Sequence, residues 1–195
     1  VSEITAKVFD NTVTALLKCR NEVNPQAVDE AVELLAHARR IEFYGLGNSG
    51  IIAADAQHKF FRFGIPTVAY ADSHIQIMAA SVLTPDDVLV TISSSGRSRE
   101  LMDAVDVALE GGAKVIAITV PDTPLAARAT VTLAVDAPED SETYSPMLSR
   151  ILHLVIIDIL TVGVALKRGP GLVTQLEKAK RSLRQKRLRS EHDDE

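Results

Sequence analysis

The sequence contains a single cysteine, no tryptophan and only 4% aromatic residues. With Cys19 alone, no disulfide can form within the chain, which excludes the small secreted folds that disulfides hold together. Cys19 lies between Leu17 and Val23 on an expected helix, which predicts a small buried hydrophobe rather than a reactive thiol. One cysteine in 195 residues is typical of the reducing cytoplasm, the location that we expect.

A long hydrophobic run and a signal peptide are also lacking. Residues 1–20 carry charged side chains throughout and have no continuous apolar centre. The most apolar segment covers 16 residues, 151–166, and is interrupted by His153 and Asp158. A membrane-spanning helix needs about 20 apolar residues, so we expect no membrane association.

Positive charge is scarce outside one segment. The net charge is −5; residues 178–189 hold seven of the 21 basic side chains, and residues 191–195 hold four acidic ones. The rest of the chain has 14 basic and 22 acidic side chains, which makes it a poor surface for nucleic acid. We interpret the basic segment as a solvated helix face and residues 188–195 as a disordered acidic tail.

Strand and helix patterns alternate from residue 41 onward. Short apolar runs predict five strands, at residues 41–44, 67–70, 88–92, 115–119 and 131–135. Helical patterns occupy residues 50–63, 73–83, 98–110 and 145–168, with Ser73 as the expected cap of the second. This alternation predicts an α/β fold: a three-layer α/β/α sandwich with a five-stranded parallel sheet in the flavodoxin-like order 2-1-3-4-5.

Two further helices precede the sheet. The first covers residues 1–21, and Asn24-Pro25 starts a second that reaches residue 38. Residues 1–40 hold five basic and six acidic side chains, so the pair lacks the basic recognition helix of a DNA-binding helix-turn-helix. We therefore expect residues 1–38 to pack on the core or on a partner subunit, and residues 39–187 to form the main domain.

The stronger functional motif follows the third expected strand. This serine loop reads Ser93-Ser94-Ser95-Gly96-Arg97-Ser98 and precedes a helix. Hydroxyl groups and free backbone N–H groups suit a phosphate, which accepts many hydrogen bonds, and the helix adds the positive end of its dipole. The loop therefore predicts a phosphate site, although a serine-rich turn with a serine cap has the same composition.

The loop after the first expected strand supports two interpretations. Its sequence Gly45-Leu46-Gly47-Asn48-Ser49-Gly50 matches the G-x-G-x-x-G fingerprint of dinucleotide-binding domains, and Asp72 stands where a ribose-binding acid would lie. However, little chain remains for the substrate domain of a dehydrogenase, and that fingerprint gives the serine loop no role. In strand order 2-1-3-4-5 both loops flank one switch point, where Ser49 and the serine loop would hold one anion.

Other chemistry has little support. The five histidines show no metal-ligand spacing, the first loop lacks the Lys-Ser/Thr of a Walker motif, and no Gly-x-Ser-x-Gly elbow occurs. We therefore expect no metal, no cofactor and no catalytic residue. His74 and Glu142 flank expected strand ends and are candidates for contact with a sugar, although polar loop residues of this kind are common.

Together the two loops resemble the sugar isomerase (SIS) fold, a phosphosugar-binding module. The resemblance implies that a first-loop serine and the hydroxyls of the second loop hold the phosphate. The matching positions in this chain are Ser49, Ser93, Ser95 and Ser98. Asn48 and Ser94 are polar neighbours of these serines and are included as candidates for the phosphate. Candidates for the sugar or a carboxylate on it are Gly47, His74, Arg97, Arg99 and Glu142.

Further segments, at residues 55–62, 74–78 and 149–158, resemble the RpiR-type bacterial transcription regulators. The resemblance covers nearly the whole chain and, within that family, points to the repressors of hexose catabolism. It implies an effector-binding domain for a phosphorylated sugar acid, 2-keto-3-deoxy-6-phosphogluconate of the Entner–Doudoroff pathway. It also implies that DNA is bound only by an N-terminal helix-turn-helix domain, which we expect to be absent from this chain.

A catalytic SIS enzyme is the main alternative to a regulator. Such isomerases need a base and an acid at the sugar carbonyl, and often show a His-Gly-Asp run after the second strand. Here that run reads His74-Ile75-Gln76, although Glu142 could still serve as a base.

The expected helix at residues 145–168 is apolar almost all round. One face can pack on the sheet, and a partner subunit is the simplest cover for the rest. With the helix that contains Ile4 and Leu17, it predicts the interface of a homodimer or higher homo-oligomer. Ligand would then act by favouring one arrangement of domains or subunits.

Overall fold

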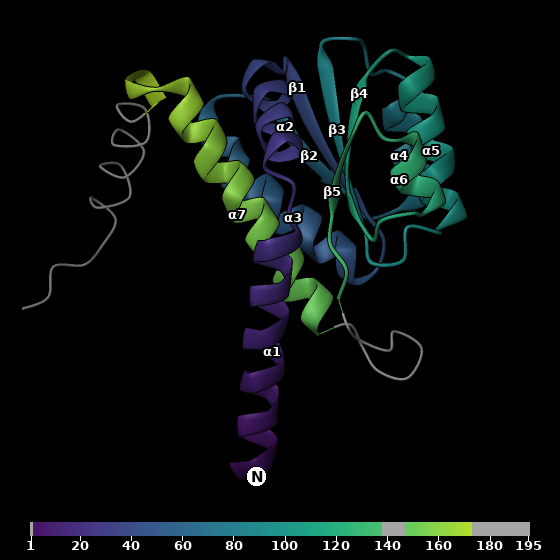
Figure 1. The fold of residues 1–195 in the computed structure, drawn as a ribbon. Helices are drawn as coiled ribbons and strands as arrows, with labels where there is room; N and C mark the ends of the chain where they lie inside the picture. The colour runs from purple at the N-terminus through teal and green to yellow at the C-terminus, as the bar shows by residue number, and fades with distance from the viewer. Residues whose placement is uncertain (1, 138–146, 173–195) are drawn as a thin grey trace, which may run out of the picture.

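The computed structural model describes residues 2–137 and 147–172 (Figure 1). Helices α1 (Ser2–Glu22) and α2 (Pro25–His37) come first. The strands are β1 (Arg40–Gly45), β2 (Thr67–Tyr70), β3 (Asp87–Ser93), β4 (Lys114–Thr119) and β5 (Val131–Ala134). The remaining helices are α3 (Asn48–Phe60), the short 3-10 helix η1 (Phe61–Phe63), α4 (Ser73–Ala80), α5 (Arg99–Glu110), α6 (Pro124–Arg128) and α7 (Leu148–Arg168).

The five strands form one parallel sheet in the order β2-β1-β3-β4-β5, which confirms the predicted fold. Tyr44 near the end of β1 is in register with Tyr70 of β2, and Gly45 is in register with Ile92 of β3. The carboxyl ends of these strands therefore lie side by side. The strand order reverses between β1 and β3, and ligands bind at such a switch point in open parallel sheets.

Side chains on the two faces of the sheet form separate hydrophobic clusters. Phe43 and Val90 pack with residues of α2, α3 and α7, whereas Tyr44 and Leu89 pack with residues of α4, α5 and α6. Figure 1 shows these two helical layers on opposite sides of the sheet. The alternation along each strand explains why both faces are apolar and both are covered.

Helix α7 belongs to the core of this domain. By length and composition alone, its 21 residues could cross a membrane, because the helix extends beyond the 16-residue run seen in the sequence. In the structure it lies against α2 and α3 instead (Figure 1). Leu152, Ile156 and Leu160 are buried, and a Cβ on Gly163 would come within 2.6 Å of Val32 on α2. This close packing is typical of a helix inside a globular domain.

Helix α1 projects from the body of the domain (Figure 1). Cys19 near its end is buried, as predicted, and burial raises the pKa of the thiol. Farther out, Ile4, Phe9 and Val13 are exposed in the single chain. The expected oligomer interface on α1 and α7 is thus compatible with the fold and stays a prediction.

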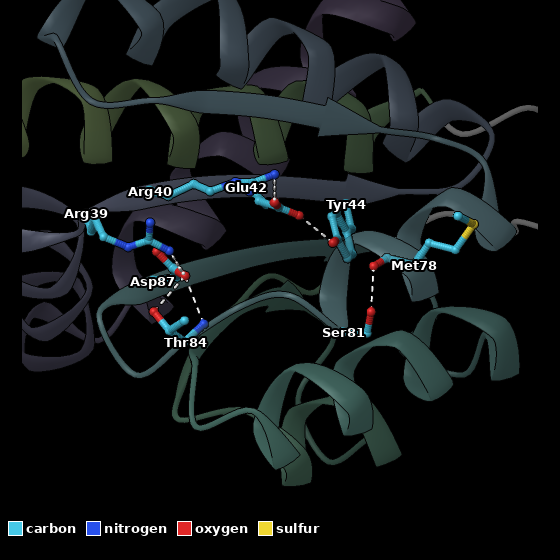
Figure 2. Close-up of polar contacts among 8 residues, drawn as sticks. All are labelled: Arg39, Arg40, Glu42, Tyr44, Met78, Ser81, Thr84 and Asp87. Carbon is cyan, nitrogen blue, oxygen red and sulfur yellow. Dashed lines mark hydrogen bonds and ion pairs between the residues drawn. The ribbon is translucent and has the colours of Figure 1, made fainter.

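A buried polar network joins the amino-terminal ends of β1 and β3 (Figure 2). The Asp87 carboxylate is fully buried and accepts hydrogen bonds from Arg39 Nη2 (2.7 Å), Thr84 N (2.8 Å) and Thr84 Oγ1 (2.9 Å). Burial alone would raise the pKa of Asp87, but these hydrogen bonds outweigh it and lower the pKa.

Glu42 is a second fully buried carboxylate in this region (Figure 2). The Tyr44 hydroxyl donates to Glu42 Oε2 at 2.5 Å, and Arg40 forms an ion pair with the other oxygen. Burial raises the pKa of Glu42, although the Tyr44 hydrogen bond and the Arg40 charge oppose the shift. The two carboxylates of the network are therefore shifted in opposite directions.

Several boundaries differ from the sequence predictions. Helix α3 begins at Asn48 rather than at Gly50, and α4 ends at Ala80 rather than at residue 83. Asp72, not Ser73, caps α4, because its carboxylate accepts a hydrogen bond from Ile75 N at 3.0 Å. Helix α6 was not predicted at all. The expected helix start at residue 145, the basic segment and the acidic tail lie outside the described residues.

Candidate functional site

The first loop turns directly into a helix. Strand β1 ends at Gly45 and α3 begins at Asn48, so Ser49 lies in the first turn of a 13-residue helix. Ser49 N donates to Leu46 O at 3.1 Å, which closes the turn, and the residue is only 8% exposed. The unpaired N–H groups and the positive dipole end of a helix start favour an anion beside this hydroxyl.

The glycines of this loop have a structural explanation. A Cβ on Gly45 would lie 2.4 Å from the carbonyl oxygen of Ser49, and a Cβ on Gly50 would lie 2.7 Å from Ala71 Cβ. Gly47 has a φ of 55°, which side chains rarely adopt. Tight packing of strand, turn and helix therefore accounts for the G-x-G-x-x-G pattern without a dinucleotide.

The serine loop is shaped by its own hydroxyls. Ser93 ends β3, and its Oγ accepts from Gly96 N at 3.0 Å, while Ser95 Oγ accepts from Arg97 N at 3.3 Å. Gly96 has a φ of 63°, and a Cβ there would lie 2.3 Å from Thr123 Oγ1. A hydroxyl that accepts one hydrogen bond still has its own proton to donate. Both serines can therefore fix the loop and bind an anion.

The two loops meet at a small polar recess. Its lining consists of Asn48, Ser49 and Ser94 from the loops, with Ile52, Ser149, Arg150 and His153. The volume is about 10 Å³, which is roughly the room for one water. The structure thus brings three of the six predicted phosphate-site residues together at the β1/β3 switch point.

Ser98 and Arg97 lie farther along the serine loop. Ser98 is the N-cap of α5, but its side chain makes no capping hydrogen bond. Arg97 lines a separate, open recess of about 700 Å³ with Asp122 and Thr123, at the connection from β4 to α6. The structure therefore does not place Arg97 on the recess that contains Ser49.

Three of the other residues predicted to contact the sugar, His74, Arg99 and Gly47, do not line the recess. The His74 side chain is 92% exposed, and its Nδ1 lies 3.9 Å from a carboxylate oxygen of Asp72. Arg99 is exposed at the start of α5, Gly47 is exposed in the first loop, and Glu142 lies outside the described residues. Across residues 2–137 and 147–172, no cluster of three or more His, Cys, Asp or Glu side chains could hold a metal.

The α7 wall of the recess was missed by the sequence analysis. Ser149 and His153 are 5% and 1% exposed, and they lie one turn apart on a helix that is otherwise mainly apolar. Arg150 lies beside them and is exposed. The spacing i, i+4 of two buried polar residues at the start of an apolar helix was the available signal.

Comparison with known protein families identifies the family to which most of the chain matches. Residues 34–163, which run from α2 into α7 and include both loops, match the SIS domain. The chain belongs to the SIS domain family. The predicted resemblance to phosphosugar-binding SIS modules is thereby confirmed at the level of the family.

Two curated proteins are similar in sequence to most of this chain. The chain is 56% identical over 168 residues to the bifunctional protein glk of Burkholderia thailandensis, covering 86% of this chain and 26% of that protein. It is 44% identical over 179 residues to the HTH-type transcriptional regulator HexR of Pseudomonas aeruginosa, covering 92% of this chain and 63% of HexR. The SIS chain thus spans less than two thirds of either relative. The match to HexR confirms the predicted resemblance to RpiR-type regulators.

A solved structure shares the whole fold. NanR of Vibrio vulnificus, determined in complex with ManNAc-6P, superposes with a TM-score of 0.88 over 95% of this chain and 70% of the NanR chain. The sequence identity is 22%, so this likeness concerns the fold.

Proposed function

We propose that this SIS domain is the effector-binding part of a transcription regulator of sugar catabolism, and that it binds a phosphorylated sugar acid. The observation that carries the proposal is the meeting of two loops at the β1/β3 switch point, where Asn48, Ser49 and Ser94 line one recess. The identity to HexR supports the regulatory role.

The phosphate of the effector would be held without a metal. Ser49 and the amides at the start of α3 form one side, and the serine loop forms the other with its hydroxyls and amides. The residues assigned to the phosphate are Asn48, Ser49, Ser93, Ser94, Ser95 and Ser98. Hydrogen bonds to a charged group contribute about 1.5–3 kcal/mol each, so three or four could support micromolar affinity, about −8 kcal/mol.

The effector that we propose is 2-keto-3-deoxy-6-phosphogluconate. The resemblance to the repressors of hexose catabolism supports this choice, and the NanR structure holds a sugar phosphate on the same fold. The whole protein would bind DNA through a helix-turn-helix domain outside this chain. It would act in the cytoplasm as a homodimer or higher homo-oligomer, with α1 and α7 at the interface.

The domain would sense its ligand rather than convert it. His74, a candidate for acid or base chemistry, is 92% exposed and does not line the recess. Effector binding would instead shift the balance between two arrangements of the regulator, by as much as its affinity differs between them. A sugar-phosphate isomerase that uses Glu142 is the competing function.

Calorimetric titration with 2-keto-3-deoxy-6-phosphogluconate and with its dephosphorylated analogue tests the proposal. We expect micromolar binding that needs the phosphate, with the ligand unchanged by NMR. Ser49→Ala should weaken binding at least tenfold, because it removes a hydroxyl from the recess. Ser93→Ala should also weaken binding at least tenfold, because it removes a serine-loop hydroxyl that also accepts the hydrogen bond from Gly96 N. Ser81→Ala, at the end of α4, is the matched control and should bind as the wild type does.

Each contrary outcome has a distinct meaning. Conversion of the ligand would place the domain among the isomerases. Equal affinity of the wild type and both site variants would remove the proposed phosphate site while leaving the fold intact.

A further inference from the structure

The loops assigned to the anion carry little positive charge. Residues 45–50 contain no charged side chain, and residues 93–98 contain only Arg97. Arg97 lines the other recess, beside Asp122 and Thr123. A sugar acid phosphate carries charge on both its phosphate and its carboxylate, so a cation at the recess must come from elsewhere in the fold.

Arg150 of α7 lines the recess together with Asn48, Ser49 and Ser94. The wall that it belongs to includes Ser149 and His153, two polar residues that are almost completely buried. Figure 1 shows α7 running beside α3, the helix that carries Ser49. The recess is thus bounded by polar side chains from three parts of the chain that are distant in sequence.

The position of Arg150 within α7 is itself informative. The first turn of a helix favours acidic side chains and disfavours basic ones, by about 0.3–1 kcal/mol. The first turns of both α3 and α7 lack an acidic residue, and Arg150 is the third residue of α7. A bound anion at the recess would be attracted by both helix starts and by the guanidinium, which would reverse this local disadvantage.

We propose that Arg150 is a specificity-determining residue of the ligand site and pairs with an anionic group of the bound sugar acid phosphate, with Ser149 and His153 completing the wall. This inference rests on the proposed function. The planar guanidinium can bind either a phosphate or a carboxylate through two hydrogen bonds, so the shared chemistry is an oxyanion. Arg97, the candidate from the sequence, would then have no direct contact with the ligand.

The test compares four variants of the full chain: Arg150→Ala, Arg150→Lys, Arg97→Ala and Arg168→Ala. Arg168 is the matched control, because it is an exposed arginine at the opposite end of the same helix. Calorimetry with 2-keto-3-deoxy-6-phosphogluconate gives the affinities. Titration with inorganic phosphate, followed by NMR of backbone amides, isolates the contribution of the phosphate.

We expect Arg150→Ala to weaken binding of the sugar acid phosphate at least tenfold, Arg150→Lys to weaken it less, and the other two variants to stay within twofold of the wild type. Loss of affinity for inorganic phosphate as well would identify the phosphate as the partner of Arg150. Loss for the sugar acid phosphate alone would identify the carboxylate.

Two results would contradict the role of Arg150 and leave the proposed function intact. One is wild-type affinity of Arg150→Ala while Ser49→Ala binds weakly. The other is a larger loss in Arg97→Ala than in Arg150→Ala, which would move the ligand toward the recess at α6. Failure of the wild type to bind any of these ligands would reject the proposed function together with the inference.

Discussion

Polar groups lie at both ends of strands β1 and β3, but those at the amino-terminal end differ in charge and in role from those at the carboxyl end. At the amino-terminal end, charged groups neutralise one another: Asp87 is paired with Arg39 and Glu42 with Arg40 (Figure 2). At the carboxyl end, the loops offer neutral hydroxyls and backbone N–H groups around a recess that contains Ser49.

This difference in polar groups indicates that the amino-terminal end contributes to stability and the carboxyl end to ligand binding. A buried charge is costly unless it is paired and hydrogen-bonded, so the ion pairs at the amino-terminal end are needed for the stability of the fold. Neutral hydroxyls can be left partly open at much lower cost, and they gain strong partners when an anion arrives. Substitutions at the first end should therefore change the free energy of unfolding, and substitutions at the second should change affinity.

The largest effect on stability is expected for Asp87→Ala. The substitution leaves Thr84 N, Thr84 Oγ1 and the Arg39 guanidinium without their acceptor, and should lower the free energy of unfolding by about 3 kcal/mol. Urea denaturation measures the change. The neighbouring exposed Asp86→Ala is the control and should stay within about 0.5 kcal/mol of the wild type. Ligand affinity of folded Asp87→Ala should be unchanged; a tenfold loss would mean that the two ends are coupled.

An intermediate effect is expected for Gly96→Ala, which disturbs the binding end through its backbone. A Cβ there would lie 2.3 Å from Thr123 Oγ1, and φ is 63°. We expect a loss of about 2 kcal/mol in stability, from left-handed strain and from the collision, and at least a tenfold loss in affinity because the serine loop must move.

Gly169→Ala provides the matched control for this glycine. Its φ is also positive, at 71°, but no atom lies within 4 Å of the added Cβ, so about 1–3 kcal/mol of backbone strain is expected without loss of affinity. Equal affinity of Gly96→Ala and the wild type in the same calorimetric assay would show that the loop conformation does not matter for binding.

The contrast between the two ends also explains what the sequence could predict. The β2 prediction matched all four residues, and the other strands were placed within a residue or two, because doubly covered strands are short apolar runs between turns. The loops were found because a helix start that follows a strand needs small and hydroxyl residues. The helix start at Asn24-Pro25 was also predicted, and the Asn24 side chain caps the helix by accepting from Gln26 N at 2.9 Å.

The parts that were missed depend on contacts between distant segments. Helix α6 has only five residues, too few to show a period. Asp72 and Ser73 are both good caps, and only the folded backbone decides between them. Arg150 and Ser49 line the same recess, although about a hundred residues separate them in the sequence. The apolar residues that follow Arg150 indicated only a helix that packs on the core. The pairing of Asp87 with Arg39 gave no local signal, because the two residues are 48 positions apart in the sequence and meet only when β3 pairs with β1.

The smallest effect is expected in the pH dependence of stability, and it sharpens the comparison within the amino-terminal network. The pKa of Glu42 is raised above 4.5, chiefly by burial, so the folded state holds this proton more tightly than the unfolded state. The contribution of Glu42 to the free energy of unfolding is therefore lost as pH rises from about 4.5 through the raised pKa. The pKa of Asp87 is lowered below 3.8, so its stability is present above that pH and is lost as pH falls through the lowered pKa.

Urea denaturation between pH 3 and pH 7, compared for the wild type, Glu42→Gln and Asp87→Asn, separates the two carboxylates. Relative to the wild type, Glu42→Gln should gain stability as pH rises above 4.5, because it removes the carboxyl group whose ionisation is disfavoured by burial. Asp87→Asn should be most damaging at neutral pH and less damaging below 3.8. The exposed Glu110→Gln serves as the control, with a profile parallel to that of the wild type. A parallel profile for Glu42→Gln as well would mean that the Arg40 charge and the Tyr44 hydrogen bond fully offset the burial of Glu42.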